Sequence, residues 1–212
     1  MAIEYTIAAF PTLYDGRLYR SRLEAKWAAF FDLCGWNAEY EPFDLGSWSP
    51  DFLLRGQRAE ILVEVKPITG IDVPTIHKMH AAAEQAGFKG DLLLVGTAPY
   101  KWGINPHQLQ MLGWMCTSET PTQCQIDRST ERSGFPAEVQ KTPWFAPAEL
   151  IYDRCFDVTG MFTFDRSRSG NDVGWGLIFG DKWNASKYAI TQQLCRKMWG
   201  KASNAVQWQP RT

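Results

Sequence analysis

Two short apolar runs separated by a four-residue turn constrain this chain more than any other feature of its sequence. The first run extends from Pro50 to Arg55 and the second from Glu60 to Lys66, with Gly56 in the turn. Runs of this length that are rich in Leu and Val and bounded by a glycine-containing loop predict the two arms of an antiparallel hairpin. Pairing the arms across the loop matches chemically compatible residues on four rungs and then places Asp51 opposite Glu64.

The rung that joins Asp51 to Glu64 is the one that strand pairing disfavours. Opposed side chains on neighbouring strands have Cβ atoms about 4.5–5.5 Å apart, and two like charges at that separation destabilise a sheet. A divalent cation between the two carboxylates removes this objection. Because side chains alternate along a strand, Lys66 shares the face of the two acids, whereas Val63 and Val65 point into the opposite, apolar layer.

This convergence of two acids and one ammonium group predicts a metal site with hydrolytic chemistry. Mg²⁺ prefers hard oxygen ligands and binds through one or two carboxylates while keeping several waters. We therefore expect Asp51 and Glu64 to ligate Mg²⁺, and the main-chain carbonyl of Val65 to add a further ligand. We expect Lys66 to hold or deprotonate the attacking water and to offset charge on a pentacoordinate phosphorane, as hydrolysis of a phosphodiester requires.

An amphipathic helix is predicted from about Ser21 to Cys34, with Gly35 as its stop signal. Glu24 lies at the border of its apolar stripe, and two interpretations of this residue are open. As the last residue of Ser21-x-x-Glu24 it completes a capping box, in which the glutamate satisfies a backbone N–H at the helix start. Alternatively, it reaches the acidic pair and ligates a second metal ion.

The remaining periodic segments predict an α/β chain in the order helix, three strands, helix, strand. Strands are expected over Trp36 to Phe43 and Asp91 to Val95, and a helix over about Pro74 to Ala86. Further on, Gly, Pro, Ser and Thr interrupt the periodic runs until Trp183 to Trp199, which we expect to be helical. The stretch from Cys116 to Thr142 is the best candidate for a long loop.

The order and spacing of the acidic and basic residues resemble the PD-(D/E)XK nuclease superfamily. The shared motif is Pro50-Asp51 and, thirteen positions on, Glu64-Val65-Lys66, with a glutamate-bearing helix before them. Similarity to phage and mobile-element members of the superfamily extends over four segments: Arg20–Trp27, Tyr40–Pro42, Pro50–Phe52 and Val63–Pro67. The resemblance covers roughly residues 17 to 97.

The resemblance implies a restriction-endonuclease-like α/β core with a central mixed sheet flanked by helices, dependence on Mg²⁺ or Mn²⁺, and cleavage of DNA. Carried over by position, it makes Asp51 and Glu64 the metal ligands, Lys66 the catalytic lysine and Glu24 the helix-borne acidic residue. No residue beyond Tyr100 carries over. We therefore expect a nuclease core over residues 1–100 and, packed on it, a C-terminal accessory region of loops, short strands and a helix over residues 101–212.

The net charge of the chain limits how it can bind DNA. Its formal net charge is −1 at pH 7, so it has no bulk attraction to a phosphate backbone and any nucleic-acid site is local.

The five cysteines are widely spaced and lack a C-x-x-C pair, which indicates neither a disulfide framework nor a zinc site. Without a signal-peptide pattern or an apolar window of about 18 residues, we expect a cytoplasmic protein with no membrane contact.

Taken together, these features predict a metal-dependent endodeoxyribonuclease that acts on DNA in phage or mobile-element recombination, repair or packaging. A homodimer fits this prediction, because cutting both strands needs two active sites or two encounters. Two alternatives stay open: a nuclease subunit that cuts transposon ends, and a catalytically silent nuclease-like module that binds DNA or protein. The near-neutral charge favours the silent module, whereas the complete set of two acids and a lysine argues against it.

Overall fold

The predicted hairpin is present in the computed structural model of the chain, which describes residues 9–55, 60–102, 109–116, 145–153, 161–166, 187–189 and 192–207. Strands β4 (Phe52–Arg55) and β5 (Glu60–Val65) pair antiparallel in the expected register. The last predicted rung is wrong, because pairing stops at Phe52 and does not place Asp51 opposite Glu64. The main chain departs from the ladder at this point, where the Asp51 N–H donates to the Val63 carbonyl at 2.9 Å.

The hairpin belongs to a mixed sheet that has eight strands in the described parts of the chain. The order across the sheet is β3 (Asn37–Tyr40), β4, β5, β6 (Asp91–Trp102), β7 (Leu109–Cys116), β8 (Phe145–Asp153) and β10 (Lys187–Ala189), and β9 (Met161–Arg166) also pairs with β8. β5 and β6 are parallel, and the other pairs are antiparallel. The chain is therefore mixed α/β, as predicted.

Helix α2 (Val73–Gln85) makes the crossover that a parallel pair of strands requires. Its N-cap is Asp72, whose carboxylate accepts a hydrogen bond from the Thr75 N–H, and a proline occupies the first turn, where no helical N–H is needed. Ile76 and Met79 are buried against Leu62 and other apolar residues of the sheet. α2 thus covers one face of the sheet, close to the end of β5.

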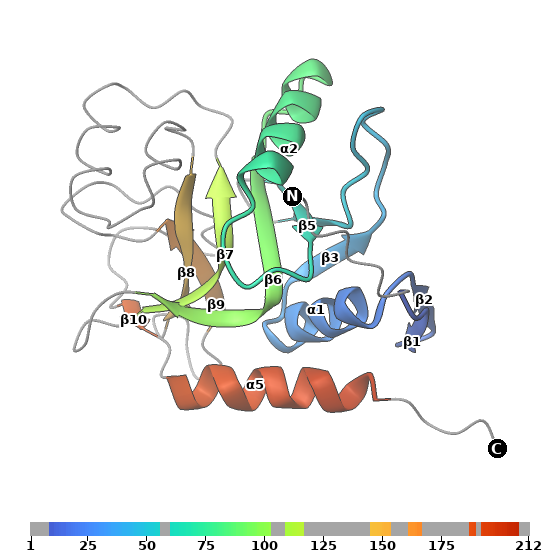
Figure 1. The fold of residues 1–212 in the computed structure, drawn as a ribbon. Helices are drawn as coiled ribbons and strands as arrows, with labels where there is room; N and C mark the ends of the chain where they lie inside the picture. Colours follow the sequence, from blue (N-terminus) through green and yellow to red (C-terminus); the bar gives the residue numbers. More distant parts are fainter. Residues whose placement is uncertain are drawn as a thin grey trace.

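The other face is covered by α1 (Arg22–Leu33) and α5 (Gln192–Ala205), which lie on the side of the sheet away from α2 (Figure 1). α1 is capped by Ser21, and Gly35, at φ +73°, follows its end as predicted. The two helices meet where the rings of Trp27 and Trp199 lie 4.8 Å apart between centroids. The Trp27 indole N–H also donates to the Gly96 carbonyl at 2.8 Å, which ties α1 to β6.

Three features of the fold differ from the expectation or were not anticipated. β6 continues to Trp102 instead of ending at Val95, because it keeps pairing with β7 after an irregularity in register. The expected helix over Trp183–Trp199 is wrong in its bounds: Lys187–Ala189 pair with β8 as β10, and α5 begins at Gln192. An unpredicted two-stranded hairpin precedes α1, formed by β1 (Thr12–Tyr14) and β2 (Arg17–Tyr19).

The division expected at residue 100 falls inside β6, and β7 to β10 extend the same sheet. Most of the loop predicted over residues 116–142 lies outside the described residues. No helix in the described ranges combines the length and the apolar character that a membrane crossing demands.

Candidate active site

Buried acidic side chains mark the candidate site. Among the described residues four polar side chains are buried, and three of them are predicted site residues: Glu24 (8% exposed), Asp51 (4%) and Glu64 (6%). A carboxylate removed from water costs free energy unless hydrogen bonds or opposite charges compensate it. The partners of these three side chains therefore define the site.

Asp51 lies directly before β4 and bridges two parts of the chain through its carboxylate. Its Oδ2 atom accepts a hydrogen bond from the Val65 N–H at 2.7 Å, and its Oδ1 atom accepts one from Arg20 Nη2 at 2.6 Å. The side chain thus reaches the end of β5 although the two main chains have stopped pairing at that point. Val65 contributes its N–H to this arrangement, and its carbonyl as a metal ligand remains a prediction.

Glu64, near the end of β5, is held by one donor on each oxygen. The Trp48 indole N–H donates to Oε2 at 2.6 Å, and Lys66 Nζ lies 2.6 Å from Oε1. Trp48 comes from the β3–β4 loop and is only 4% exposed, so its ring is fixed by packing. As predicted from strand alternation, Val63 and Val65 belong to the apolar layer under α1, on the opposite face of the sheet.

Glu24 contacts the cap of α1, but its carboxylate accepts from the Ser21 hydroxyl and not from a backbone N–H as in a full capping box, and its role as a ligand of a second metal ion remains a prediction. Its N–H donates to the hydroxyl of Ser21 at 3.1 Å, which makes Ser21 the N-cap of α1. Its Oε1 accepts from the Ser21 hydroxyl at 2.7 Å, and its Oε2 accepts from the Tyr40 hydroxyl at 2.5 Å. The same Oε2 lies 3.8 Å from Arg20 Nε. Glu24 therefore stabilises the helix start and also lies next to the cation that binds Asp51.

Arg20 links the acidic residues of the site. Besides Asp51 and Glu24, its guanidinium contacts Glu41, with Nε 2.8 Å from Oε1. Glu41 has φ +47°, a left-handed conformation that costs a non-glycine residue energy, and its N–H donates to the Asp51 carbonyl at 2.9 Å. The Arg20 N–H donates to the Tyr40 hydroxyl at 2.9 Å, while the side chain remains 54% exposed.

Four residues that contact the predicted acids had no predicted role: Arg20, Tyr40, Glu41 and Trp48. The first three lie inside segments that resemble the nuclease superfamily, which is the one signal that points to them. Trp48 carries no such signal, because nothing local distinguishes a loop tryptophan that fills a core from one whose indole N–H binds a carboxylate.

The electrostatics of the site follow from burial and from the closeness of like charges. Burial and the negative charge of Glu64 raise the pKa of Asp51 to about 7, against the hydrogen bond from Val65 and the charge of Arg20, which lower it. Burial lowers the pKa of Lys66, but the hydrogen bond and charge of Glu64 outweigh it, so the net pKa shift is upward. Lys66 is thus an ammonium group at neutral pH.

The donor set fits a hard divalent cation. No group of three or more His, Cys, Asp or Glu side chains with metal-binding geometry occurs in the part of the chain that the structure describes. Two neighbouring carboxylates are nevertheless sufficient for Mg²⁺, which binds proteins through one or two carboxylates and fills its octahedron with water and substrate oxygens. Asp51 and Glu64 would hold such an ion, and their oxygen donors suit Mg²⁺ or Mn²⁺.

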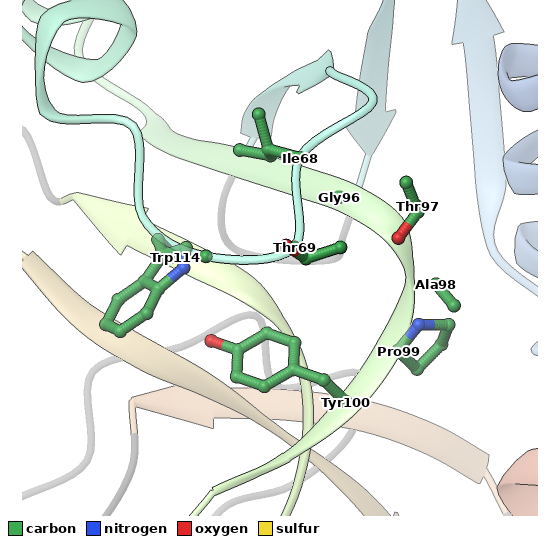
Figure 2. A pocket seen from close by; sticks show the side chains of 9 residues that line it. Ile68, Thr69, Gly96, Thr97, Ala98, Pro99, Tyr100 and Trp114 are labelled. Carbon is green, nitrogen blue, oxygen red and sulfur yellow. The ribbon is translucent and has the colours of Figure 1, made fainter.

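A hollow of about 130 Å³ lies beside the main chain that follows Lys66. It is bounded by the segment after Lys66, Ile68–Gly70, by Gly96–Tyr100 of β6, and by Trp114 of β7. Figure 2 shows the side chains of Thr69, Tyr100 and Trp114 gathered around it. The Lys66 N–H donates to the Val95 carbonyl at 3.0 Å, so the hollow begins one residue beyond the last parallel pair of β5 and β6.

Comparison of the chain with protein-family models, with curated proteins and with solved structures finds no significant match.

Proposed function

We propose that this protein is a divalent-metal-dependent endodeoxyribonuclease with a restriction-endonuclease-like core, in which Asp51, Glu64 and Lys66 carry the reaction. The observation that supports this most directly is the pair of buried carboxylates, one directly before β4 and one on β5, with an ammonium group 2.6 Å from the second. Like charges are not buried together for stability. Burying two carboxylates close together costs free energy, and a metal ion bound between them would offset it. Lys66 is partly open to solvent and is therefore suited to contact a phosphate.

In the proposed reaction, Asp51 and Glu64 hold the metal ion, and Lys66 acts on the phosphate and the attacking water. Mg²⁺ supplies Lewis-acid polarisation of the phosphate and a more acidic bound water. Lys66, charged at neutral pH, orients the water and stabilises negative charge that develops on the phosphate oxygens. Trp48 fixes one oxygen of Glu64, and the Val65 N–H fixes one oxygen of Asp51, so both carboxylates are oriented before the ion arrives.

DNA is the proposed substrate, and processing of phage or mobile-element DNA, including cleavage of transposon ends, is the proposed context. Both rest on the resemblance of the motif residues and their flanking segments to the PD-(D/E)XK superfamily. The hollow bounded by Ile68–Gly70, which begins two residues after Lys66, is the proposed place for part of a substrate strand. The proposed site is local, as a chain with net charge −1 requires.

One observation favours a second function, a nuclease-like module that binds DNA or protein without cleaving. Every oxygen of Asp51 and Glu64 already accepts a hydrogen bond or ion pair from a protein donor. In a silent module these contacts would be permanent and would replace the metal ion. Cleavage assays separate the two functions.

The decisive experiment incubates the full chain with supercoiled plasmid, single-stranded, flapped and four-way DNA, in the presence of Mg²⁺, Mn²⁺ or EDTA. We expect cleavage with either metal, none in EDTA, and a loss of at least a hundredfold in the Glu64→Gln variant, because the substituted amide is a poor metal ligand. Glu60→Gln is the matched control, since Glu60 lies on the same strand but is exposed and pairs with Arg55 instead.

Two results would count against the nuclease. Absence of metal-dependent cleavage on all four substrates would favour the silent module. Equal cleavage by the Glu64→Gln and Glu60→Gln variants would show that the activity comes from elsewhere in the chain or from a contaminant.

A further inference from the structure

Arg20 lies on the side of Asp51 that faces solvent, and its guanidinium pairs with the Asp51 carboxylate. One carboxylate oxygen of Asp51 is held by the Val65 N–H, so the other, Oδ1, is the oxygen that remains for a cation. Arg20 Nη2 lies 2.6 Å from this oxygen. The arginine side chain is 54% exposed, whereas that of Asp51 is 6% exposed. The guanidinium therefore closes the solvent side of a buried acid.

The charge around Arg20 is unbalanced. Glu24, Glu41 and Asp51 each have a carboxylate oxygen within 4 Å of the one guanidinium, at 3.8, 2.8 and 2.6 Å. One positive charge does not neutralise three negative ones, and Glu64 adds to the field felt by Asp51. A divalent cation at Asp51 would be attracted by the same charges that hold Arg20, so the two cations compete for Oδ1.

Arg20 is anchored in a way that lets its head group change partners. Its N–H donates to the Tyr40 hydroxyl, and it directly precedes Ser21, the N-cap of α1. The main chain is thus fixed by helix and hydrogen bond, while the long, half-exposed side chain can rotate. A guanidinium released from one carboxylate at the rim of the site suits a phosphate, which it binds through two parallel N–H donors.

We propose that Arg20 is a further catalytic residue: it holds Asp51 in the metal-free protein, exchanges that contact for a divalent cation, and then binds a non-bridging oxygen of the phosphate under attack. The proposal rests on the nuclease function proposed above. It differs from a static structural ion pair in two respects. A static pair keeps its contact with Asp51 when the metal ion binds, and its loss does not slow cleavage once the metal site is saturated.

The test compares Arg20→Gln and Arg20→Lys with Arg55→Gln. Arg55 is the matched control because it also pairs with two glutamates, Glu39 at 2.9 Å and Glu60 at 3.6 Å, and is 42% exposed, but it contacts none of the site acids. Mn²⁺ affinity is measured by titration calorimetry at pH 8 without DNA, and circular dichroism verifies that each variant is folded. Cleavage of the best DNA substrate is then measured at saturating Mn²⁺.

We expect Arg20→Gln to bind Mn²⁺ about tenfold more tightly, because it removes a hydrogen-bonded competing charge. At saturating Mn²⁺ we expect its cleavage rate to fall about a hundredfold, the typical effect of removing one donor from a developing oxyanion. Arg20→Lys keeps the charge, so its Mn²⁺ affinity should stay near that of the natural protein and its cleavage rate should be intermediate. Arg55→Gln should change neither quantity.

Mn²⁺ affinity in Arg20→Gln that is unchanged or weaker would overturn the proposed exchange at Asp51. Natural cleavage rates in Arg20→Gln at saturating Mn²⁺ would overturn the catalytic role. If the natural protein cleaves no substrate while Arg20→Gln still binds Mn²⁺ more tightly, the nuclease function and the catalytic role both fail, and the exchange at Asp51 stands. The two proposals therefore fail in distinguishable ways.

Discussion

At the scale of single residues, the site depends on donors that orient two buried carboxylates. Trp48 is the least obvious of them. Its indole N–H is aimed at Glu64 Oε2 from a loop that is itself held by hydrogen bonds: Leu45 N–H to the Trp48 carbonyl at 2.9 Å, and Gly46 N–H to the Asp44 carboxylate at 2.8 Å. Loss of a hydrogen bond that orients a metal ligand typically weakens metal affinity about tenfold to a hundredfold.

Replacing Trp48 by Phe tests this orientation. The aromatic ring that packs with the α2 layer is largely kept, whereas the donor to Glu64 is lost. We expect Mn²⁺ affinity to fall about tenfold and the metal-free protein to lose about 1–3 kcal/mol of unfolding free energy, because a buried carboxylate oxygen loses its partner. Calorimetry with Mn²⁺ and urea unfolding in EDTA measure the two effects.

Trp36→Phe provides the comparison, since Trp36 is equally buried but packs against Phe31 in the other apolar layer. We expect this variant to keep its Mn²⁺ affinity. Equal weakening of Mn²⁺ binding in both variants would mean that the effect reflects general loosening of the core and not the indole donor.

The sequence indicates which acids are brought together but not how they are held. The burial of Asp51 and Glu64 follows from their place within apolar segments of the hairpin. The position of Lys66 on the same face as Glu64 follows from the alternation of side chains along the strand. The contact between Asp51 and the Val65 N–H could not be predicted, because simple register counting assumes that the ladder continues to Asp51. Trp48 and Glu41 act through loop conformations, including a positive φ at Glu41, that no periodicity encodes.

At the scale of secondary-structure elements, the position of Lys66 depends on the close approach of β5 and β6. The Thr97 N–H donates to the Ile68 carbonyl at 2.9 Å, so the segment after Lys66 stays against β6 beyond the end of the strand. This approach requires glycine at position 96, because a Cβ atom there would lie 2.4 Å from the Ile68 carbonyl oxygen. The obstacle is main chain, which cannot rotate away as a side chain would.

Gly96→Ala is therefore expected to push the Lys66–Ile68 segment away from β6. We predict a loss of about 1–3 kcal/mol of unfolding free energy, the range for forced overpacking, and slower cleavage at saturating metal because Lys66 moves with the segment. Gly200→Ala is the control: Gly200 lies in α5, a Cβ atom there meets nothing within 4 Å, and alanine should stabilise the helix by about 0.5–1 kcal/mol. Natural stability and activity in Gly96→Ala would contradict the role assigned to this contact.

Local signals made some elements predictable, whereas those formed by distant pairing were not. α1 has a capping serine, an apolar stripe and a terminal glycine, and its predicted bounds agree with the structure to within a residue. The β1–β2 hairpin was missed although its turn, Asp15-Gly16, is a known hairpin signal with both residues at positive φ. The extension of β6 and the identity of β10 depend on pairing with β7 and β8, which local sequence does not reveal.

At the scale of the whole molecule, the buried acidic residues of the proposed site lower the stability of the fold at neutral pH. The sheet has an apolar layer on each face, so the protein has a core that can accommodate a few unfavourable contacts. Asp51 is one of these contacts, because the fold raises its pKa from 3.8 to about 7. A carboxyl group whose pKa is higher in the folded state stabilises the fold when it is protonated, and this stabilisation is lost as the pH rises through the folded-state pKa.

The unfolding free energy should therefore fall as the pH rises, and the Asp51→Asn substitution should remove this pH dependence. In EDTA, the unfolding free energy of the natural protein should fall by roughly 2 kcal/mol between pH 5.5 and pH 8 relative to the variant, since about one and a half pH units of titration lie below the folded pKa. Asp15→Asn, an exposed turn substitution at a φ that asparagine tolerates, should show the natural pH profile. Urea unfolding across this pH range measures the difference, and parallel profiles for Asp51→Asn and the natural protein would refute it.

At pH 8, saturating Mn²⁺ should stabilise the natural protein and not Asp51→Asn, because binding to the folded state alone stabilises it and the amide is a poor ligand.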